Sequence, residues 1–353
     1  MSGASRHLKE IERFLALAGL VRPHKGDHHP AAKGKEDGET PGCSVRPLPE
    51  RLAAEAAGVA AAVNPVNAPP NLSGLAASAP SISFLTASVG KYLGAQPRTL
   101  TVSFMETTPV PLRNRIIEHL NAWNVCCGIQ FRHTTGTGQV RISRTGRGYW
   151  SYLGTDVLLI PRDRPTMNLQ SFTMATSESE YRRVVRHEAG HTLGFEHEHM
   201  RKELVDRIDP TKAYAYFLRT QGWDKAMVDA QVLTPLSQSS IMGTPADATS
   251  IMCYQLPGSI MKNGIGIAGG TDINATDCAY AGQIYPRGGR ATGGGAGPSA
   301  APAASVTASR PGADPVADRG AAYDDIPADW PRGEDVDAAA AIEEFLSESG
   351  PAR

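Results

Sequence analysis

The sequence feature that most constrains this chain is the segment HEAGHTLGFEH at residues 187–197. His187 and His191 stand four residues apart, so on a helix their imidazoles lie on one face and can converge on a single metal ion. Glu188 lies between them and would project beside that ion. We therefore expect this segment to form a helix that carries two metal ligands and an acidic group.

The residues that follow extend the same pattern. Gly194 would let the backbone leave the helix sharply, at positive φ, and bring His197 in as a third ligand. Three neutral histidines around Zn²⁺ leave a fourth position open for water, which is typical of a catalytic rather than a structural site. One zinc ion is thus the predicted cofactor, with Glu188 as the general base that takes a proton from water. Surface histidines that never bind metal are the alternative, but chance is a poor explanation for so many matched positions.

A second informative segment is TSIMCYQLP at residues 249–257. Met252 in a tight turn would provide an apolar floor beneath the imidazoles, and Tyr254 would place its phenol near the metal. The competing interpretation of Met252 is an ordinary core residue. A similar triplet at residues 240–242 lacks the tyrosine, so the short pattern is weak by itself.

Composition divides the 353 residues into one globular stretch between two biased ends. Residues 1–80 are predicted to hold a helix at 7–21 and a disordered segment that is a candidate propeptide. Residues 81–286 form the predicted core domain. Residues 287–353 are expected to be a disordered Gly/Ala/Pro linker and acidic tail, with a marginal helix at 338–346.

The net charge and the hydropathy of the chain limit the kinds of partner that it is expected to bind. The net charge of −1 and the pI near 6.8 give no global basic field, so nucleic acid is not an expected partner. The N-terminal apolar run follows acidic residues directly and is not read as a secretory signal, and no run approaches the about 20 residues needed to span a bilayer. We expect a monomer without a membrane span, and the compartment stays open.

Hydrophobic periodicity predicts a mixed set of strands and helices in the core domain. Strands are expected at residues 99–105, 129–131, 139–142, 149–152 and 157–160, and helices at residues 50–62, 112–123 and 177–193. The last helix should begin near Ser177, where Ser-x-Ser-Glu has N-cap chemistry before an apolar-periodic run.

The five cysteines are odd in number and lack the spacing of a disulfide framework or a structural zinc site. Adjacent Cys126 and Cys127 fall at a helix-to-strand junction, where one of them could pair with Cys278. Buried free thiols are the favoured interpretation.

Three separated segments resemble the astacin family of metzincin endopeptidases. GYWSYLG at residues 148–154 is similar to the family's G-C-W-S-Y-x-G stretch, HEAGHTLGFEHEHMR to its zinc helix and following turn, and SIMCY to its S-I-M-H-Y Met-turn. With TDINATDCAYAGQIYP near the end of the domain, the resemblance covers roughly residues 85–286. Tyr149 and Cys253 replace the family's cysteine and histidine in the first and third segments.

The resemblance implies an α+β fold, namely a metzincin-type zincin catalytic domain with a twisted mixed sheet, an active-site helix and two lobes around a cleft. It implies a protein or peptide substrate that lies extended along an edge strand near residues 150–152 and is cut at internal bonds. Tyr254 would be a further metal ligand at rest and would swing to stabilise the oxyanion. Glu198 would pair with the N-terminus of the matured chain, although residues 1–80 show no aspartate-switch motif.

Three other interpretations remain open. The chain could be a matrixin-like metzincin protease, although Tyr254 and the W-S-Y segment favour the astacin side. It could be a catalytically silent zinc-binding interaction module, although such a protein would be expected to lose Glu188 first. The biased ends could also act as recruitment segments that place a protease near its targets.

Overall fold

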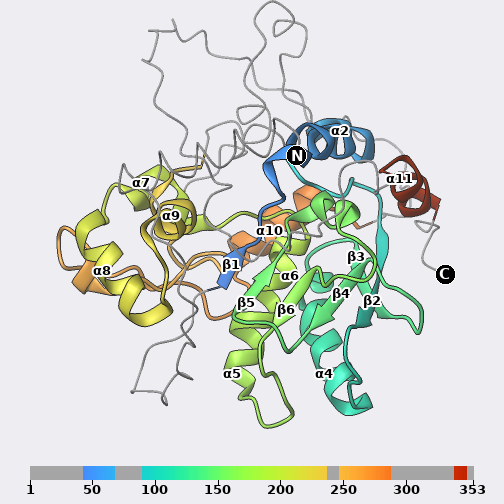
Figure 1. The fold of residues 1–353 in the computed structure, drawn as a ribbon, viewed down its shortest axis with the longest axis horizontal. Coiled ribbons are helices and arrows are strands. Elements are labelled where there is room, and N and C mark those ends of the chain that lie inside the picture. Colours follow the sequence, from blue (N-terminus) through green and yellow to red (C-terminus); the bar gives the residue numbers. More distant parts are fainter. Residues whose placement is uncertain (1–42, 68–89, 237–245, 288–337, 348–353) are drawn as a thin grey trace, which may run out of the picture. The chain divides into compact units, whose positions relative to one another are not determined.

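The computed structural model describes residues 43–67, 90–236, 246–287 and 338–347, shown in colour in Figure 1. The helix predicted at residues 7–21 and the linker that follows residue 287 lie outside this part of the chain.

A six-stranded mixed sheet forms the centre of the fold (Figure 1). Its strands are β1 (Cys43–Val45), β2 (Arg98–Phe104), β3 (Ile129–His133), β4 (Val140–Ser143), β5 (Tyr149–Ser151) and β6 (Met167–Leu169). They are arranged in the order β1-β5-β6-β4-β2-β3, and every neighbouring pair is parallel except β5 and β6. β5 is therefore the last strand before β1, which comes from the N-terminal part of the chain.

The helices are short, and several are 3-10 or π turns. The α-helices are α2 (Ala53–Val63), α4 (Val110–Leu120), α5 (Glu178–Glu180), α6 (Arg186–Thr192), α7 (Lys202–Val205), α8 (Pro210–Gln221), α9 (Lys225–Val228), α10 (Ala275–Ile284) and α11 (Ala338–Ser347). The 3-10 helices are η1 (Glu50–Leu52), η2 (Pro65–Asn67), η4 (Asn121–Val125), η5 (Gly154–Leu159), η7 (Glu198–Met200) and η9 (Gly258–Ile260), and the π turns are η6 (Tyr181–Val185) and η8 (Asp229–Leu233).

The predicted elements are largely confirmed, with one error and several omissions. The apolar run at 157–160 forms part of the 3-10 helix η5 instead of a strand. A short apolar run does not distinguish a strand from a buried helical turn, and Gly154, at φ 44°, bends the chain into the turn. The strands β1 and β6 and the helices α7 to α10 were not predicted. The helices predicted at 50–62 and 338–346 are confirmed and correspond to η1 with α2 and to α11.

The helix predicted from Ser177 to residue 193 is confirmed as α5, η6 and α6 in direct succession. The Ser177 side chain accepts a hydrogen bond from the Glu180 backbone N–H, which caps the first turn. The π turn η6 buries Tyr181, Val184 and Val185 at its inner face. α6 contacts β5, and so the residues of α6 are placed beside the strand at the end of the sheet.

The cysteine interpretation requires a correction. Cys126, at the end of η4, forms a disulfide with Cys278 in α10, so the favoured interpretation of free thiols is wrong for this pair. The Cα atoms lie 4.8 Å apart, within the range that a disulfide spans. Cys43, Cys127 and Cys253 are free and buried.

Two helices remote in sequence lie together beside the sheet. α2 contacts α11, as the blue and red helices of Figure 1 show, and it also contacts η5. Among the described residues, no helix combines the length and the apolar character needed to cross a membrane.

Candidate functional site

The helix α6 directs two imidazoles toward one point. His187 Nδ1 lies 2.7 Å from the Ile251 carbonyl oxygen, and His191 Nδ1 lies 2.7 Å from the Phe195 carbonyl oxygen. Because a carbonyl only accepts, each Nδ1 carries a proton and each Nε2 keeps its lone pair. Both side chains are buried, and burial lowers the pKa of His187 to about 4 and that of His191 well below its usual value. The two rings are therefore neutral at physiological pH.

His197 lies beside the two histidines of α6. Gly194 has φ 88°, and a Cβ there would lie 2.9 Å from the Lys91 carbonyl oxygen, so both the conformation and the space require glycine. After this turn His197 Nε2 lies 3.0 Å from His191 Nε2. One ligand atom from each of His187, His191 and His197 lies within 4.8 Å of the others.

The donor set fits zinc. His187 Nε2 is buried and has no hydrogen-bond partner within the described residues, while the other two Nε2 atoms face each other. The contact at 3.0 Å between His191 Nε2 and His197 Nε2 is a hydrogen bond if the His197 ring carries its proton on Nε2, and a bound cation would instead take the lone pairs of both atoms. Three neutral imidazoles with an acidic neighbour are the donor set of a catalytic zinc site.

Glu188 lies in the same space. It is fully buried, and neither carboxylate oxygen makes a hydrogen bond of good geometry within the described part of the chain. Burial raises the pKa of Glu188 to about 8, against smaller opposing effects of the nearby Cys43 thiol and Arg183. A cation at the imidazoles would oppose that rise. The carboxylate is thus placed to hold or release a proton.

The Met-turn lies directly against the helix. A Cβ on Gly190 would lie 2.3 Å from the Met252 sulfur, so the thioether occupies the space that a side chain at 190 would need. The turn is also joined to the third ligand, because the Glu198 backbone N–H donates to the Met252 carbonyl at 2.9 Å. Met252 is therefore placed as predicted, in contact with the helix that carries two of the histidines.

Two residues that the sequence analysis missed support this arrangement. Asp277, in the first turn of α10, accepts hydrogen bonds from the Ser250 hydroxyl at 2.6 Å and the Ile251 backbone N–H at 2.9 Å, which fixes the start of the Met-turn. His199 is buried, and its Nε2 lies 2.8 Å from the Gln231 carbonyl oxygen. The capping pattern N-x-x-D at residues 274–277 was the available signal for Asp277.

The Tyr254 ring packs among the histidines. Its centroid lies 4.5 Å from that of His197 and 4.2 Å from that of His199, with which it stacks at 15°. The side chain is 8% exposed. The structure thus brings Tyr254 to the predicted neighbourhood of the three imidazoles.

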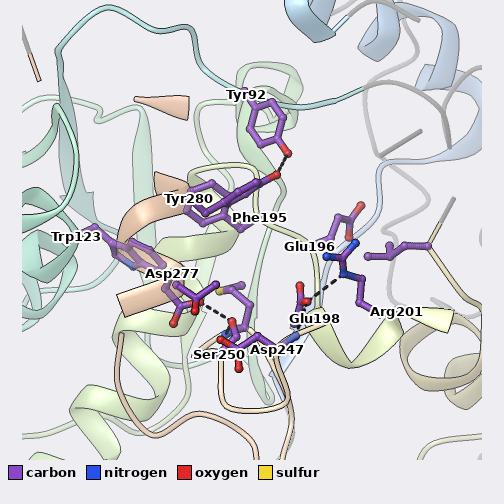
Figure 2. A pocket seen from close by; sticks show the side chains of 13 residues that line it. Tyr92, Trp123, Phe195, Glu196, Glu198, Arg201, Asp247, Ser250, Asp277 and Tyr280 are labelled. Carbon is purple, nitrogen blue, oxygen red and sulfur yellow. Dashed lines mark hydrogen bonds and ion pairs between the residues drawn. The ribbon is translucent and has the colours of Figure 1, made fainter. Parts of the chain in front are cut away.

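Glu198 lies beside a separate pocket rather than among the imidazoles. Figure 2 shows this pocket, in which the Glu198 carboxylate pairs with Arg201 at 3.0 Å and the Tyr92 and Tyr280 hydroxyls meet. The Asp247 backbone N–H also donates to Glu198 at 3.0 Å. In this structure the carboxylate is bound by groups of the core domain.

One further residue near the histidines was not predicted. Cys43, in β1, is 1% exposed, and its sulfur lies within 4.8 Å of ligand atoms of His187 and Glu188. In the sequence it is only one of five cysteines. No local pattern could have found it, because β1 is brought to the site by pairing with β5.

Comparisons with known proteins agree with this geometry. The profile of the astacin peptidase family matches residues 98–264. Zinc metalloproteinase nas-27 of Caenorhabditis elegans is 30% identical over 121 residues, which are 32% of this chain and 26% of that protein's length. The match thus spans about a quarter of this relative. A structure of myroilysin superposes with a TM-score of 0.52 at 31% identity and covers 56% of this chain and 96% of its own.

The residues that the family profile matches include the histidine helix and the Met-turn. They also confirm the predicted fold class, an α+β metzincin-type domain with a mixed sheet and an active-site helix. This chain therefore belongs to the astacin family of metallopeptidases.

Proposed function

We propose that the protein is a zinc-dependent metalloendopeptidase that hydrolyses internal peptide bonds. The observation that carries the proposal is the convergence of three neutral, buried imidazole nitrogens beside the buried carboxylate of Glu188. His187, His191 and His197 would hold one zinc ion, which when bound supplies a Lewis acid for the peptide carbonyl and for water.

Glu188 would act as the general base. Its carboxylate takes a proton from the water that attacks the peptide carbonyl and then delivers it to the departing amine nitrogen. Tyr254 would donate its phenolic hydrogen to the carbonyl oxygen as negative charge develops there, since its ring lies beside His197. No covalent enzyme intermediate is needed.

The substrate would add to the sheet as an extended strand at β5. Backbone hydrogen bonds along such an edge do not depend on side chains, which suits cleavage within a polypeptide. β1 pairs with this strand, with Cys43 opposite Tyr149 and Val45 opposite Ser151. The segment that contains β1 and α2 therefore has to leave before a substrate can bind, which supports its assignment as a propeptide.

Zinc content and cleavage of an unfolded protein substrate, measured on the same preparations, test this function. The full chain would be compared before and after limited proteolysis that removes residues upstream of Gly90. We expect stoichiometric zinc in both forms and cleavage by the trimmed form. Glu188→Ala should retain zinc and lose cleavage, and Glu203→Gln, which removes an exposed carboxylate on α7, should change neither.

Two outcomes would contradict the proposal. Cleavage that survives in Glu188→Ala or in chelator-treated protein would remove the carboxylate or the metal from the reaction. Stoichiometric zinc without cleavage by the trimmed chain would favour a zinc-dependent binding module. The expected monomeric state is checked on the same samples by light scattering.

A further inference from the structure

The Gln231 side chain binds the backbone of β1. Its Oε1 accepts a hydrogen bond from the Val45 backbone N–H at 3.2 Å, and its Nε2 donates to the Val45 carbonyl oxygen at 3.2 Å. A neighbouring strand offers the same two groups, one acceptor and one donor, to a residue at the edge of a sheet. The amide of Gln231 therefore takes the place of a strand on the outer side of β1.

β5 binds the other side of β1. Val45 is paired with Ser151 of β5, and the Arg46 backbone N–H donates to the Ser151 carbonyl oxygen at 2.9 Å. Successive residues of a strand direct their backbone polar groups to opposite sides, so the backbone of Arg46 faces β5 while that of Val45 faces Gln231. We call the place that β1 occupies between Ser151 and Gln231 the strand site.

Gln231 is held firmly on its own side of the strand site. Its side chain is 5% exposed, and Ala230 and Val232 beside it in η8 are also buried. Its backbone carbonyl accepts a hydrogen bond from His199 Nε2 at 2.8 Å, and η8 packs on η7, which contains His199. A side chain that is already ordered loses little conformational entropy when it binds a second partner.

The strand site passes beside the proposed catalytic groups. Cys43 stands two residues before Val45, and its sulfur lies within 4.8 Å of ligand atoms of His187 and Glu188. A chain that replaces β1 would therefore place one residue beside these two side chains. The residue two places further along would lie where Val45 lies now, against the amide of Gln231.

We propose that Gln231 binds the backbone of the peptide substrate once β1 has left. The assignment rests on the proposed function, in which the substrate adds to β5. Gln231 accepts a hydrogen bond from the N–H and donates one to the carbonyl of the substrate residue that takes the place of Val45. The terminal torsion of a glutamine side chain is roughly two-fold, so the amide can present its oxygen and nitrogen in either order. The contact thus suits a chain of either direction.

This contact makes the cleft selective for backbone rather than for side chains. Departure of β1 breaks both hydrogen bonds of the buried Gln231 amide to Val45, and a substrate that restores both gains affinity from them. Every residue except proline has the backbone N–H that the contact needs. Gln231 therefore favours an extended chain without proline at this one position.

Peptide substrates in which one amide at a time is replaced by an ester test the contact. An ester lacks the N–H and keeps the length of the chain. KM and kcat are measured on the full chain after limited proteolysis upstream of Gly90, with esters at successive residues on both sides of the scissile bond. An ester at the residue bound by Gln231 should raise KM about tenfold. In Gln231→Met that increment should vanish, whereas esters at residues that face β5 should raise KM equally in both proteins.

Two further variants complete the comparison. Gln139→Met is the matched control, because the Gln139 side chain also accepts a backbone hydrogen bond, from the Thr101 N–H at 3.1 Å. Thr101 lies in β2, which β6 and β4 separate from β5, so this variant should keep the full response to the ester. Gln231→Glu keeps an acceptor and loses the donor. It should raise KM for the all-amide peptide and still respond to the ester, and it serves as the test if Gln231→Met does not fold.

Failure of this proposal differs from failure of the proposed function. An ester response that is equal in Gln231→Met and the unaltered chain, or an unchanged KM for the all-amide peptide in Gln231→Glu, would overturn the role of Gln231 and leave the peptidase intact. Absence of cleavage by the trimmed unaltered chain would overturn the proposed function. Binding of the same labelled peptides to trimmed Glu188→Ala, followed by fluorescence anisotropy, compares the Gln231 variants without turnover, and equal dissociation constants would again overturn the contact.

Discussion

Met252 packs against Gly190 so closely that a Cβ at position 190 would lie 2.3 Å from the thioether sulfur. The helix α6 and the Met-turn thus pack closely because residue 190 has no side chain. The glycine falls inside the H-E-x-x-H pattern at a position that the pattern leaves open.

Gly190→Ala should destabilise the fold by about 1–3 kcal/mol, because the added methyl group forces a shift of Met252 or of α6. Urea unfolding measures the change. Gly58→Ala in α2 is the control, since a Cβ there meets no atom within 4 Å and alanine favours a helix. We expect Gly58→Ala to be neutral or slightly stabilising. Equal changes in the free energy of unfolding at the two positions would show that the close approach of Met252 to residue 190 does not cause the destabilisation.

Zinc should raise the thermal midpoint of the apoprotein, because an ion that binds the folded chain stabilises it by about 2.7 kcal/mol at a hundredfold excess over Kd. His197→Ala removes one of the facing Nε2 atoms and should abolish most of this increment at the same zinc concentration. His119→Gln changes a buried histidine that is not one of the proposed zinc ligands and should preserve the zinc-dependent rise of the thermal midpoint. A full zinc-dependent shift in His197→Ala would remove that residue from the proposed ligands.

The Cys126–Cys278 disulfide should contribute about 2–4 kcal/mol to the free energy of unfolding, through its effect on the unfolded chain. Replacement of both cysteines by serine tests this in denaturant titrations. Cys127→Ser retains the bridge and separates loss of the cross-link from loss of a buried thiol. If reductant alters the unfolding midpoint of the double-serine variant as much as that of the unaltered chain, the bridge does not explain the difference.

Glu106 should make the free energy of unfolding depend on pH in the acid range. Burial acts to raise its pKa, but hydrogen bonds from the Ser143 and Thr145 hydroxyls and the Arg144 backbone N–H outweigh this and lower the pKa of Glu106 below its usual value. The folded state therefore favours the ionised form. Its stabilising contribution is present above the unfolded pKa and is lost as the pH falls through the lowered folded value.

Glu106→Gln should accordingly be less stable than the unaltered chain at neutral pH, and the difference should shrink in strong acid. Urea midpoints across this pH range measure it. Glu203→Gln, on the exposed side of α7, should show no comparable trend. A difference between Glu106→Gln and the unaltered chain that stays constant with pH would exclude ionisation of Glu106 as its cause.

Local spacing made much of the fold and site predictable. The helix, the Gly194 turn and the Met252 segment each depend on residues close in sequence, where periodicity and turn chemistry decide the structure. The prediction for 157–160 was wrong because a short buried apolar stretch suits either a strand or a helical turn. Which of two adjacent cysteines reaches Cys278 depends on side-chain direction, which composition does not encode.

The role of β1 could not be read from sequence for a different reason. Its three residues carry no alternation that marks a strand, and its place is fixed by pairing with β5 and by Gln231. Such contacts between distant segments leave no local signature. The same holds for Asp277, whose carboxylate caps its own helix and also holds the Met-turn.

The pairing of β1 with β5 also has a consequence for handling the trimmed protein. Once β1 is gone, β5 presents a row of unsatisfied backbone donors and acceptors, which is a template for the strand of any neighbouring molecule. The surface that would recognise substrate is then the surface most prone to self-association. The solubility of the trimmed protein should therefore depend on this exposed edge of β5 more than on the net charge of the chain.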